Sequence, residues 1–173
     1  PYAIGSIRLD RTEFDFPDAH RGEKPTITFS VVNLSDRPYE PVLMHLPPYL
    51  KMERTPDVVL KGKKGKIKLT LDTKQLTDLG LTQTSVYLAR FAGDKVSEEN
   101  EIPVSAILLP DFSGMTMQDS LNAPAIRLSE DNIDLSARLA KKNKASHDIV
   151  ITNTGKAPLQ ISKLQVFNSS VGV

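Results

Sequence analysis

The amino-acid sequence predicts an all-β fold, and three observations support this prediction. Several short segments alternate apolar and polar side chains, as half-buried strands do, and glycine, proline, asparagine and aspartate separate them. Helical signals in the first half of the chain are confined to one short segment. One strand-and-turn pattern also appears twice. We therefore predict an immunoglobulin-like β-sandwich of about seven strands followed by the start of a second, similar sandwich.

The repeated pattern is a strand that runs into a turn beginning with asparagine. Residues 26–38 read TITFSVVNLSDRP and residues 146–158 read SHDIVITNTGKAP. Apolar and polar side chains alternate in both segments until Asn33 or Asn153 opens the turn, and a proline closes it. The two asparagines are 120 positions apart, a distance much longer than one strand and its turn.

The beginning of the chain recurs at almost the same spacing. Residues 7–9 and 126–128 both read IRL and are 119 positions apart, so one inserted residue aligns both parts of the match. A repeat of this length indicates two copies of a domain. We assign residues 1–110 to a complete sandwich, 111–124 to a linker rich in Pro, Gly, Ser, Asp and Asn, and 125–173 to the N-terminal part of a second sandwich.

The first elements of the predicted sandwich are short. Residues 7–16 are expected to form a pair of edge strands, and a turn at 18–25 leads into the strand at 26–33. Proline is excluded from helix interiors and central strands, so the prolines between 38 and 48 predict short extended pieces. The large side chains expected to be buried here are Leu9, Phe14, Phe16 and Phe29.

The later elements are more regular. Residues 61–72 contain the clearest amphipathic strand, with aliphatic residues alternating with lysine and threonine. Residues 73–80 predict one helical turn with Gly80 as its left-handed terminator. Residues 81–92 and 102–109 predict a hairpin across the polar loop 93–101.

The second copy stops after its first strands. Ile149, Ile151 and Phe167 would then lack the strands that cover such residues in a complete sandwich. Three explanations stay open: the remainder was removed or left out, it is disordered, or another chain supplies the missing strands. We favour the first. Because the chain starts at Pro1 and not at methionine, we also expect a processed form whose signal peptide is not visible.

These motifs support a family resemblance. The segments that carry it are FDF at 14–16, GEKPTITFSVVN at 22–33, KGKKGKIKLTLDTKQLTDLG at 61–80 and VITNTGKAPLQISKL at 150–164. They resemble the tandem immunoglobulin-like domain-of-unknown-function family of exported Bacteroidetes proteins, akin to Hydin-type and major-sperm-protein-like sandwiches. The resemblance implies a periplasmic or extracellular protein without an established activity. Many members carry cysteines where this chain reads FNSSVGV, so no role of those cysteines is transferred.

Composition excludes several classes of function. Lys and Arg number 22 against 21 Asp and Glu, a net charge of +1, which gives no reason to expect nucleic-acid binding. The absence of cysteine excludes disulfides, thiolate nucleophiles and zinc–thiolate sites. No apolar run is long enough to predict a transmembrane segment.

The candidate chemical groups point away from catalysis. His20, His45 and His147 lack the close spacing of a metal site, and no G-x-S-x-G elbow would hold a nucleophilic serine. Residues 62–66, GKKGK, lack the spacing of a phosphate-binding loop and precede a strand, so we predict a turn. We therefore expect no enzyme, no catalytic residue, no cofactor and no metal site.

Three surface features are weaker candidates. Residues 62–66 together with Lys51, Arg54 and Lys68 would form a basic strip, which would bind anionic glycans or lipid vesicles at low salt. Glu98, Glu99 and Glu101 would hold a calcium ion weakly, since they lack the alternating oxygen ligands of a dedicated loop. The acceptor patterns at 33–35 and 168–170 are common by chance, whereas Asp119-Ser120-Leu121 resembles an O-glycosylation motif of exported Bacteroidetes proteins.

We therefore expect a non-catalytic cell-envelope module that binds or spaces other proteins or glycans through its sheet edges and loops. One alternative is a chaperone-like or fibre subunit that accepts a strand from a partner. Another is the ancillary domain of a larger enzyme. The sequence leaves the oligomeric state open.

Overall fold

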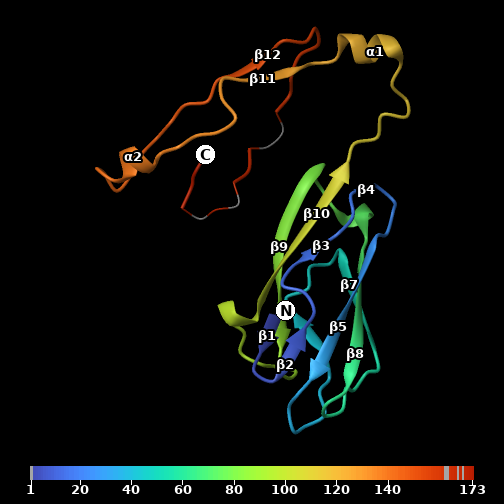
Figure 1. Ribbon diagram of the computed structural model, residues 1–173. Coiled ribbons are helices and arrows are strands. Elements are labelled where there is room, and N and C mark those ends of the chain that lie inside the picture. The colour runs from blue at the N-terminus through green and yellow to red at the C-terminus, as the bar shows by residue number, and fades with distance from the viewer. Residues whose placement is uncertain (1, 162–163, 167, 169) are drawn as a thin grey trace. The chain divides into compact units, whose positions relative to one another are not determined.

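The computed structural model describes residues 2–161, 164–166, 168 and 170–173, and it contains two compact units (Figure 1). Unit 1 comprises Pro1–Asp111 and unit 2 comprises Phe112–Val173. Unit 1 is built from β-strands arranged as two sheets, and unit 2 is built around one short hairpin. Phe167, which we expected to need a covering strand, lies outside the described residues.

Unit 1 is a β-sandwich, which confirms the predicted fold class. Its first sheet has the strand order β1-β2-β5-β8-β7, with bounds Tyr2–Ile4, Ile7–Leu9, Thr26–Asn33, Lys64–Leu71 and Leu50–Thr55. Its second sheet has the order β3-β10-β9-β6, with bounds Phe14–Asp15, Glu101–Leu109, Gly80–Ala89 and Val42–Met44. Strand β4, Ala19–His20, also pairs with β10.

The N-terminal segment is divided between the two sheets, which sequence alternation did not reveal. Strand β2 pairs antiparallel with β5, whereas β3 pairs parallel with β10 in the opposite sheet. Residues 7–16 therefore form two strands in different sheets and not a local pair, because the chain crosses the edge of the sandwich between them. The hairpin predicted around residues 93–101 is confirmed as β9 and β10, with a 3₁₀ turn, η2, at Glu98–Asn100.

The helical turn predicted at residues 73–80 is shorter than expected. Residues Thr73–Gln75 form a single 3₁₀ turn, η1, and Leu76 already has an extended backbone. Gly80 does have a positive φ of 84°, but it begins strand β9 and does not end a helix. The backbone amide of Lys74 donates to the Asp72 carboxylate, which caps the turn.

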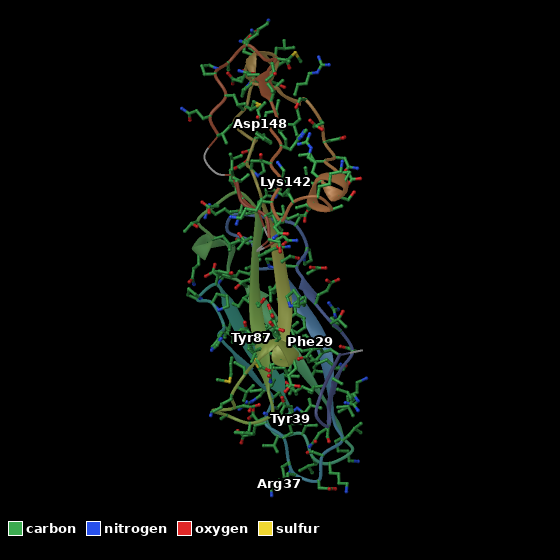
Figure 2. All side chains as sticks on the ribbon, turned by 90° about the vertical axis from the view of Figure 1, so that its left-hand side faces the viewer. Phe29, Arg37, Tyr39, Tyr87, Lys142 and Asp148 are labelled. Atoms are coloured by element: carbon green, nitrogen blue, oxygen red, sulfur yellow. The ribbon has the colours of Figure 1, made fainter. Side chains whose placement is uncertain are left out.

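The core lies between the inner faces of the two sheets. In β5 the side chains of Ile27, Phe29 and Val31 are buried, and in β8 the aliphatic residues Ile67 and Leu69 are buried, so both predicted registers are confirmed. Phe29 pairs with Ile67 across the sheet and stacks on Phe14 of the other sheet, with ring centroids 4.3 Å apart. Figure 2 shows Phe29 inside the sandwich.

A substitution at this contact tests the register. Phe29 is 1% exposed, so Phe29→Asp should unfold unit 1, because it forces a carboxylate into an apolar site. Lys68→Asp, on the solvent face of β8, should change stability by less than about 1 kcal/mol. Thermal unfolding of both variants provides the comparison, and equal melting temperatures would contradict the assigned register.

Asn33 ends β5 as a buried polar residue. Its side-chain amide donates to the Arg37 carbonyl at 2.7 Å and the Val59 carbonyl at 2.8 Å. Its side-chain oxygen accepts the Ser35 backbone amide at 2.9 Å. The side chain therefore closes the turn after β5 and ties it to the segment before β8. Arg37 lies at the end of this turn (Figure 2).

Unit 2 contains a two-stranded antiparallel sheet, with β11 at Ile126–Leu128 and β12 at Ile151–Asn153. Two short helices accompany it, α1 at Met117–Asn122 and α2 at Ser136–Leu139. Helix α1 lies within the segment predicted as a linker. It starts there because Thr116 and Asp119 form a capping box, each side chain accepting the other residue's backbone amide.

The asparagine turn of unit 1 has a close match in unit 2. The Asn153 side-chain amide donates to the Ala157 carbonyl at 2.8 Å, and its oxygen accepts the Gly155 amide at 3.0 Å. The corresponding Asn33 bonds involve Arg37 and Ser35. The asparagine and both of these partners are shifted by the same 120 positions. The difference is exposure, because Asn33 is buried and Asn153 is exposed.

This difference predicts unequal effects of the same substitution. Asn33→Ala should destabilise unit 1 by roughly 1–3 kcal/mol, because it removes the hydrogen bonds of a fully buried amide, including the buried bond to the Val59 carbonyl. Asn153→Ala should have a smaller effect on unit 2, because water reaches the groups left without a partner. Hydrogen exchange of the β5 and β12 amides, followed through denaturant, would measure each unit separately. Equal losses of stability in both units would show that burial of the asparagine does not cause the difference.

Candidate functional site

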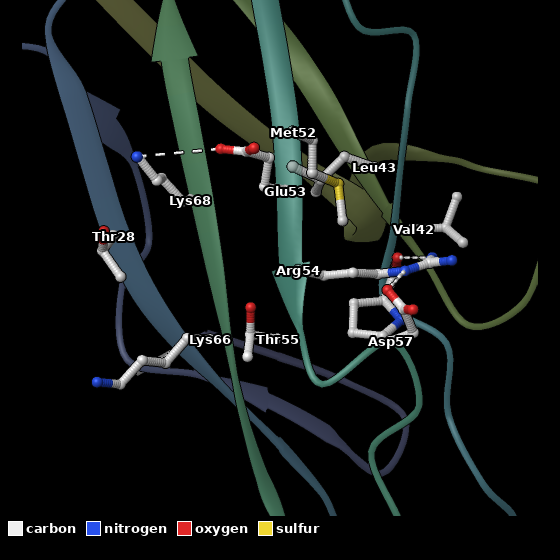
Figure 3. A pocket seen from close by; sticks show the side chains of 11 residues that line it. Thr28, Val42, Leu43, Met52, Glu53, Arg54, Thr55, Asp57, Lys66 and Lys68 are labelled. Atoms are coloured by element: carbon white, nitrogen blue, oxygen red, sulfur yellow. Dashed lines mark hydrogen bonds and ion pairs between the residues drawn. The ribbon is translucent and has the colours of Figure 1, made fainter.

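A groove of about 870 Å³ at the edge of the sandwich, here called the edge groove, is the main candidate site (Figure 3). Strand β7 is the last strand of the first sheet and β6 is the last strand of the second. The residues that line the groove are Thr28, Pro41, Val42, Leu43, Met52, Glu53, Arg54, Thr55, Asp57, Lys66 and Lys68. The groove thus follows the open side of two edge strands.

Alternation along β7 explains the mixed lining. Met52 and Arg54 are half-buried, whereas Glu53 and Thr55 are exposed on the outer face of the sheet. Val42 of β6 is half-buried and lines the same groove. Since β7 pairs only with β8 among the described strands, the backbone amides and carbonyls of its other side are directed away from the sheet.

Several charges at the groove form ion pairs. The Arg54 guanidinium donates to the Pro41 carbonyl at 2.7 Å, and its Nε lies 3.6 Å from an Asp57 carboxylate oxygen. Glu53 carboxylate oxygens lie 4.0 Å from the Nζ atoms of both Lys51 and Lys68. The structure therefore places two carboxylates beside three cations of the predicted basic strip. The positive charge of the strip is partly compensated, which weakens the case for anion binding there.

The GKKGK segment is only in part the turn that we predicted. Gly62 has a positive φ of 72° in a turn, but residues 64–66 already belong to β8. Gly65 is required by close packing, because a Cβ atom there would lie 2.6 Å from Cγ2 of Val59. The alternating lysines after Gly62 place their charges on the solvent face of the sheet, where they do not converge on a phosphate-sized site.

The carboxylate with the largest described pKa shift lies outside the edge groove, in the loop after β9. The Arg90 guanidinium donates to Asp94 at 2.9 Å and 2.8 Å, and the Arg90 backbone amide donates at 3.0 Å. These bonds lower the pKa of Asp94 from 3.8 to about 2. Because the pair holds the ends of one loop, we assign it a structural role.

The lowered pKa makes a pH prediction. A carboxyl group with a depressed folded-state pKa stabilises the fold above its unfolded pKa, and this contribution is lost as pH falls through the folded value. Unit 1 should therefore lose stability between pH 3.8 and about 2 through Asp94. Asp94→Asn should remove this part of the acid profile, measured by unfolding at each pH. Asp57→Asn, which removes one carboxylate from an exposed position, is the matched control.

The three histidines have separate surroundings. His20 lies near Glu23, His45 contacts the Tyr87 ring edge-on at 5.0 Å, and His147 lies 2.5 Å from Glu130. No group of three or more histidine, aspartate or glutamate side chains with metal-binding geometry occurs in the described part of the chain. In the acidic loop, Glu101 instead accepts a hydrogen bond from Ser85 at 2.6 Å.

The candidate modification sites differ in access. The side chain of Asn33 is buried and hydrogen-bonded, so the first acceptor pattern is closed to a glycosyltransferase in the folded protein. Ser169 of the second pattern lies outside the described residues. Ser120 is exposed on α1, and not in irregular linker as we expected.

A basic loop in unit 2 was not identified from the sequence. A hollow of about 320 Å³ is lined by Arg138, Lys141, Lys142, Lys144, Ala145 and Ser146, and Lys142 is labelled in Figure 2. The cluster of cationic residues between positions 138 and 144 is the sequence feature that could have predicted this loop. Arg138 donates to the Ser146 carbonyl at 2.9 Å, which closes this loop on itself. No helix among the described residues is both long enough and apolar enough to span a bilayer.

Comparisons with known proteins identify the fold and no family. Neither a protein-family model nor a curated protein matches the chain. A crystal structure of a protein of unknown function from Porphyromonas gingivalis W83 is similar, with a TM-score of 0.54 and 15% identity. The match covers 72% of this chain and 56% of that one, so this chain spans little more than half the length of that protein.

Two other solved structures show weaker similarity. A PapD-like domain of human CEP192 has a TM-score of 0.44 and 12% identity, over 61% of this chain and 87% of that domain. The Pseudomonas aeruginosa CupB2 chaperone has a TM-score of 0.40 and 14% identity, over 69% of this chain and 63% of that one. The chain is therefore an all-β, immunoglobulin-like sandwich protein whose structural relatives include a Bacteroidetes protein of unknown function.

Proposed function

We propose that this protein is a non-catalytic module of the cell envelope that binds or spaces other components through protein contacts at its sheet edges. The observation that carries the proposal is the edge groove, which two edge strands line and where Arg54 and Lys68 lie in ion pairs with Asp57 and Glu53. A groove with paired charges and an open strand edge suits recognition of a polypeptide.

The lining of the groove favours a peptide over a sugar. Val42, Leu43 and Met52 supply apolar contacts, and Arg54 and Glu53 supply charges at its rim. None of the lining residues is aromatic, so no ring is available for a sugar to stack on. An extended segment lying along β7 would obtain main-chain hydrogen bonds from the strand and side-chain contacts from the groove.

The spacing role rests on a proposed duplication. The repeated sequence pattern and the matched asparagine turns support two copies of one domain, with the first at residues 1–110 and the second starting at residue 125. Sandwiches in series extend a chain by whole domains, which suits a module that spaces other components. Export is supported by the family resemblance of the sequence motifs.

Anionic glycan binding is the second candidate, and the basic loop of unit 2 favours it. The four cationic side chains that line its hollow have no acidic residue among the other lining residues, unlike the cations of the edge groove. Binding of an acidic polysaccharide that falls steeply with salt, and that Lys141→Glu together with Lys142→Glu removes, would support this candidate.

Photo-cross-linking in the organism that makes the protein tests the proposed contact. A photoreactive amino acid at Met52 should give defined protein adducts in the envelope fraction, because this half-buried position faces the groove. The matched control is Leu34, an apolar residue that is 52% exposed on the turn after β5. If neither Met52 nor Val42 gives adducts above the Leu34 level, or if the protein fractionates with the cytoplasm, the proposal fails.

A further inference from the structure

The strands of the two sheets of unit 1 differ in charge. The first sheet contains six basic residues, which are Arg8, Lys51, Arg54, Lys64, Lys66 and Lys68. Strands β3, β6, β9 and β10 of the second sheet contain no lysine or arginine, and their acidic residues are Asp15 and Glu101. The strands of the second sheet therefore offer no cation to an anionic ligand on their outer face.

An aromatic pair lies on this outer face. Val86 and Leu88 are fully buried, so the alternation of β9 directs Tyr87, which lies between them, to the solvent side of the sheet (Figure 2). The exposed His45 follows β6 directly, and its ring centroid lies 5.0 Å from that of the half-buried Tyr87, with 70° between the ring planes. The two nearly perpendicular rings form an apolar corner.

His45 has an unusual backbone. Its φ is 60°, and no other described residue apart from glycine has a positive φ. A residue with a Cβ atom rarely adopts this conformation, whereas glycine adopts it without strain. Strained residues of this kind concentrate at functional sites, where the position of the side chain is the feature that matters. At this position the strain places an imidazole ring against Tyr87.

Polar side chains accompany the aromatic pair. Glu101 of β10 is directly opposite Tyr87, and it lies on the outer face because its neighbour Ile102 is fully buried. The Ser85 hydroxyl donates to the Glu101 carboxylate at 2.6 Å, which fixes the orientation of this acceptor. Gln83 is exposed on the same face of β9. The residues of this set, here called the Tyr87 site, are His45, Gln83, Ser85, Tyr87 and Glu101.

The backbone at the Tyr87 site is occupied by neighbouring strands. Strand β9 lies between β10 and β6, and β10 lies between β9 and the short strands β3 and β4. The main-chain amides and carbonyls of β9 and β10 at this site are therefore directed to strands that are already present, and a peptide cannot extend the sheet here. Recognition at the Tyr87 site has to come from side chains.

We propose that the Tyr87 site binds a neutral hexopyranose unit of a glycan. A pyranose ring presents C–H groups that pack on aromatic rings, and it carries hydroxyl groups that both donate and accept hydrogen bonds. The Glu101 carboxylate accepts bonds from such hydroxyls, and the Gln83 amide can donate as well as accept. A cationic side chain only donates, so it would leave the donor groups of Gln83 unused.

This glycan-binding activity goes beyond the protein contacts proposed at the edge groove. The Tyr87 site shares no residue with the lining of that groove, so sugar binding at Tyr87 and cross-linking at Met52 succeed or fail separately. It also differs from the basic loop of unit 2, whose four cations favour an acidic polysaccharide. The variant with Lys141→Glu and Lys142→Glu should therefore bind a neutral glycan as the wild type does.

Titration of the isotope-labelled full chain with neutral oligosaccharides tests the site. The probes are maltohexaose, cellohexaose and mannohexaose, each at millimolar concentration. At least one of them should shift the backbone amide resonances of Ser85, Tyr87 and Glu101 until saturation. The amides of Lys66 and Lys68, on the outer face of the first sheet, should not shift. The shifts should be equal at low and high salt, because a neutral ligand has no charge to be screened.

Variants at two positions test the chemistry. Tyr87→Phe keeps the ring and should retain affinity within about threefold, whereas Tyr87→Leu keeps an apolar side chain without a ring and should weaken binding at least about tenfold. Glu101→Gln keeps an acceptor oxygen without the charge and should weaken binding by about threefold to tenfold. All three variants are measured with the oligosaccharide that gives the largest shifts.

A glycine at position 45 separates binding from stability. Glycine adopts the φ of 60° without strain, and this relief offsets the greater entropy of the unfolded chain. His45→Gly should therefore leave the melting temperature nearly unchanged while it weakens oligosaccharide binding at least about fivefold. Full affinity in this variant would show that the imidazole ring is not part of a sugar site.

Three results would overturn the proposal. The first is the absence of a saturable shift with every one of the three oligosaccharides in a chain whose spectrum remains that of the folded protein. The second is unchanged affinity in Tyr87→Leu and His45→Gly. The third is a response that trilysine reproduces and that salt abolishes, because the site would then bind a cation through Glu101 and not a neutral sugar.

Discussion

The apolar contact between the two sheets of unit 1 is the interaction on which its other features depend. Its centre is the stacked pair of Phe14 and Phe29, one ring from each sheet, both almost fully buried. Burying an aromatic or aliphatic side chain contributes about 1.5–3 kcal/mol, and the alternation of the strands directs a row of such side chains inward. With the inner faces occupied by one another, only the outer faces, the loops and the strand edges remain for function.

Short strands and paired charges protect the sheet edges of unit 1. An open sandwich always has edge strands whose backbone groups lack partners, and natural proteins protect them with charges or keep them short. In unit 1, β1 and β6 are short and β7 carries paired charges. An edge that carries charges selects its partner by charge and groove shape.

Buried polar groups fix the turns that connect the sheets. Asn33 satisfies the carbonyls of Arg37 and Val59, and the Tyr39 hydroxyl donates to the Ala89 carbonyl at 2.7 Å. Burial raises the pKa of the Tyr39 phenol, which keeps it a neutral donor. Such bonds contribute modestly when made but are costly when lost, so they specify one arrangement of the turns. This explains why an asparagine at the end of a strand marks the repeat better than the aliphatic residues around it.

The sequence by itself determined the fold class, the inward register of β5 and β8, and the hairpin of β9 and β10, because alternation and turn residues are local properties of the chain. It did not reveal that residues 7–16 divide between two sheets, since the parallel pairing of β3 with β10 joins residues about ninety positions apart. It also did not reveal that Lys51, Arg54 and Lys68 each lie beside a carboxylate. Only the tertiary structure decided which strands became edges, and therefore where the candidate sites lie, because an edge is defined by the strands that are absent beside it.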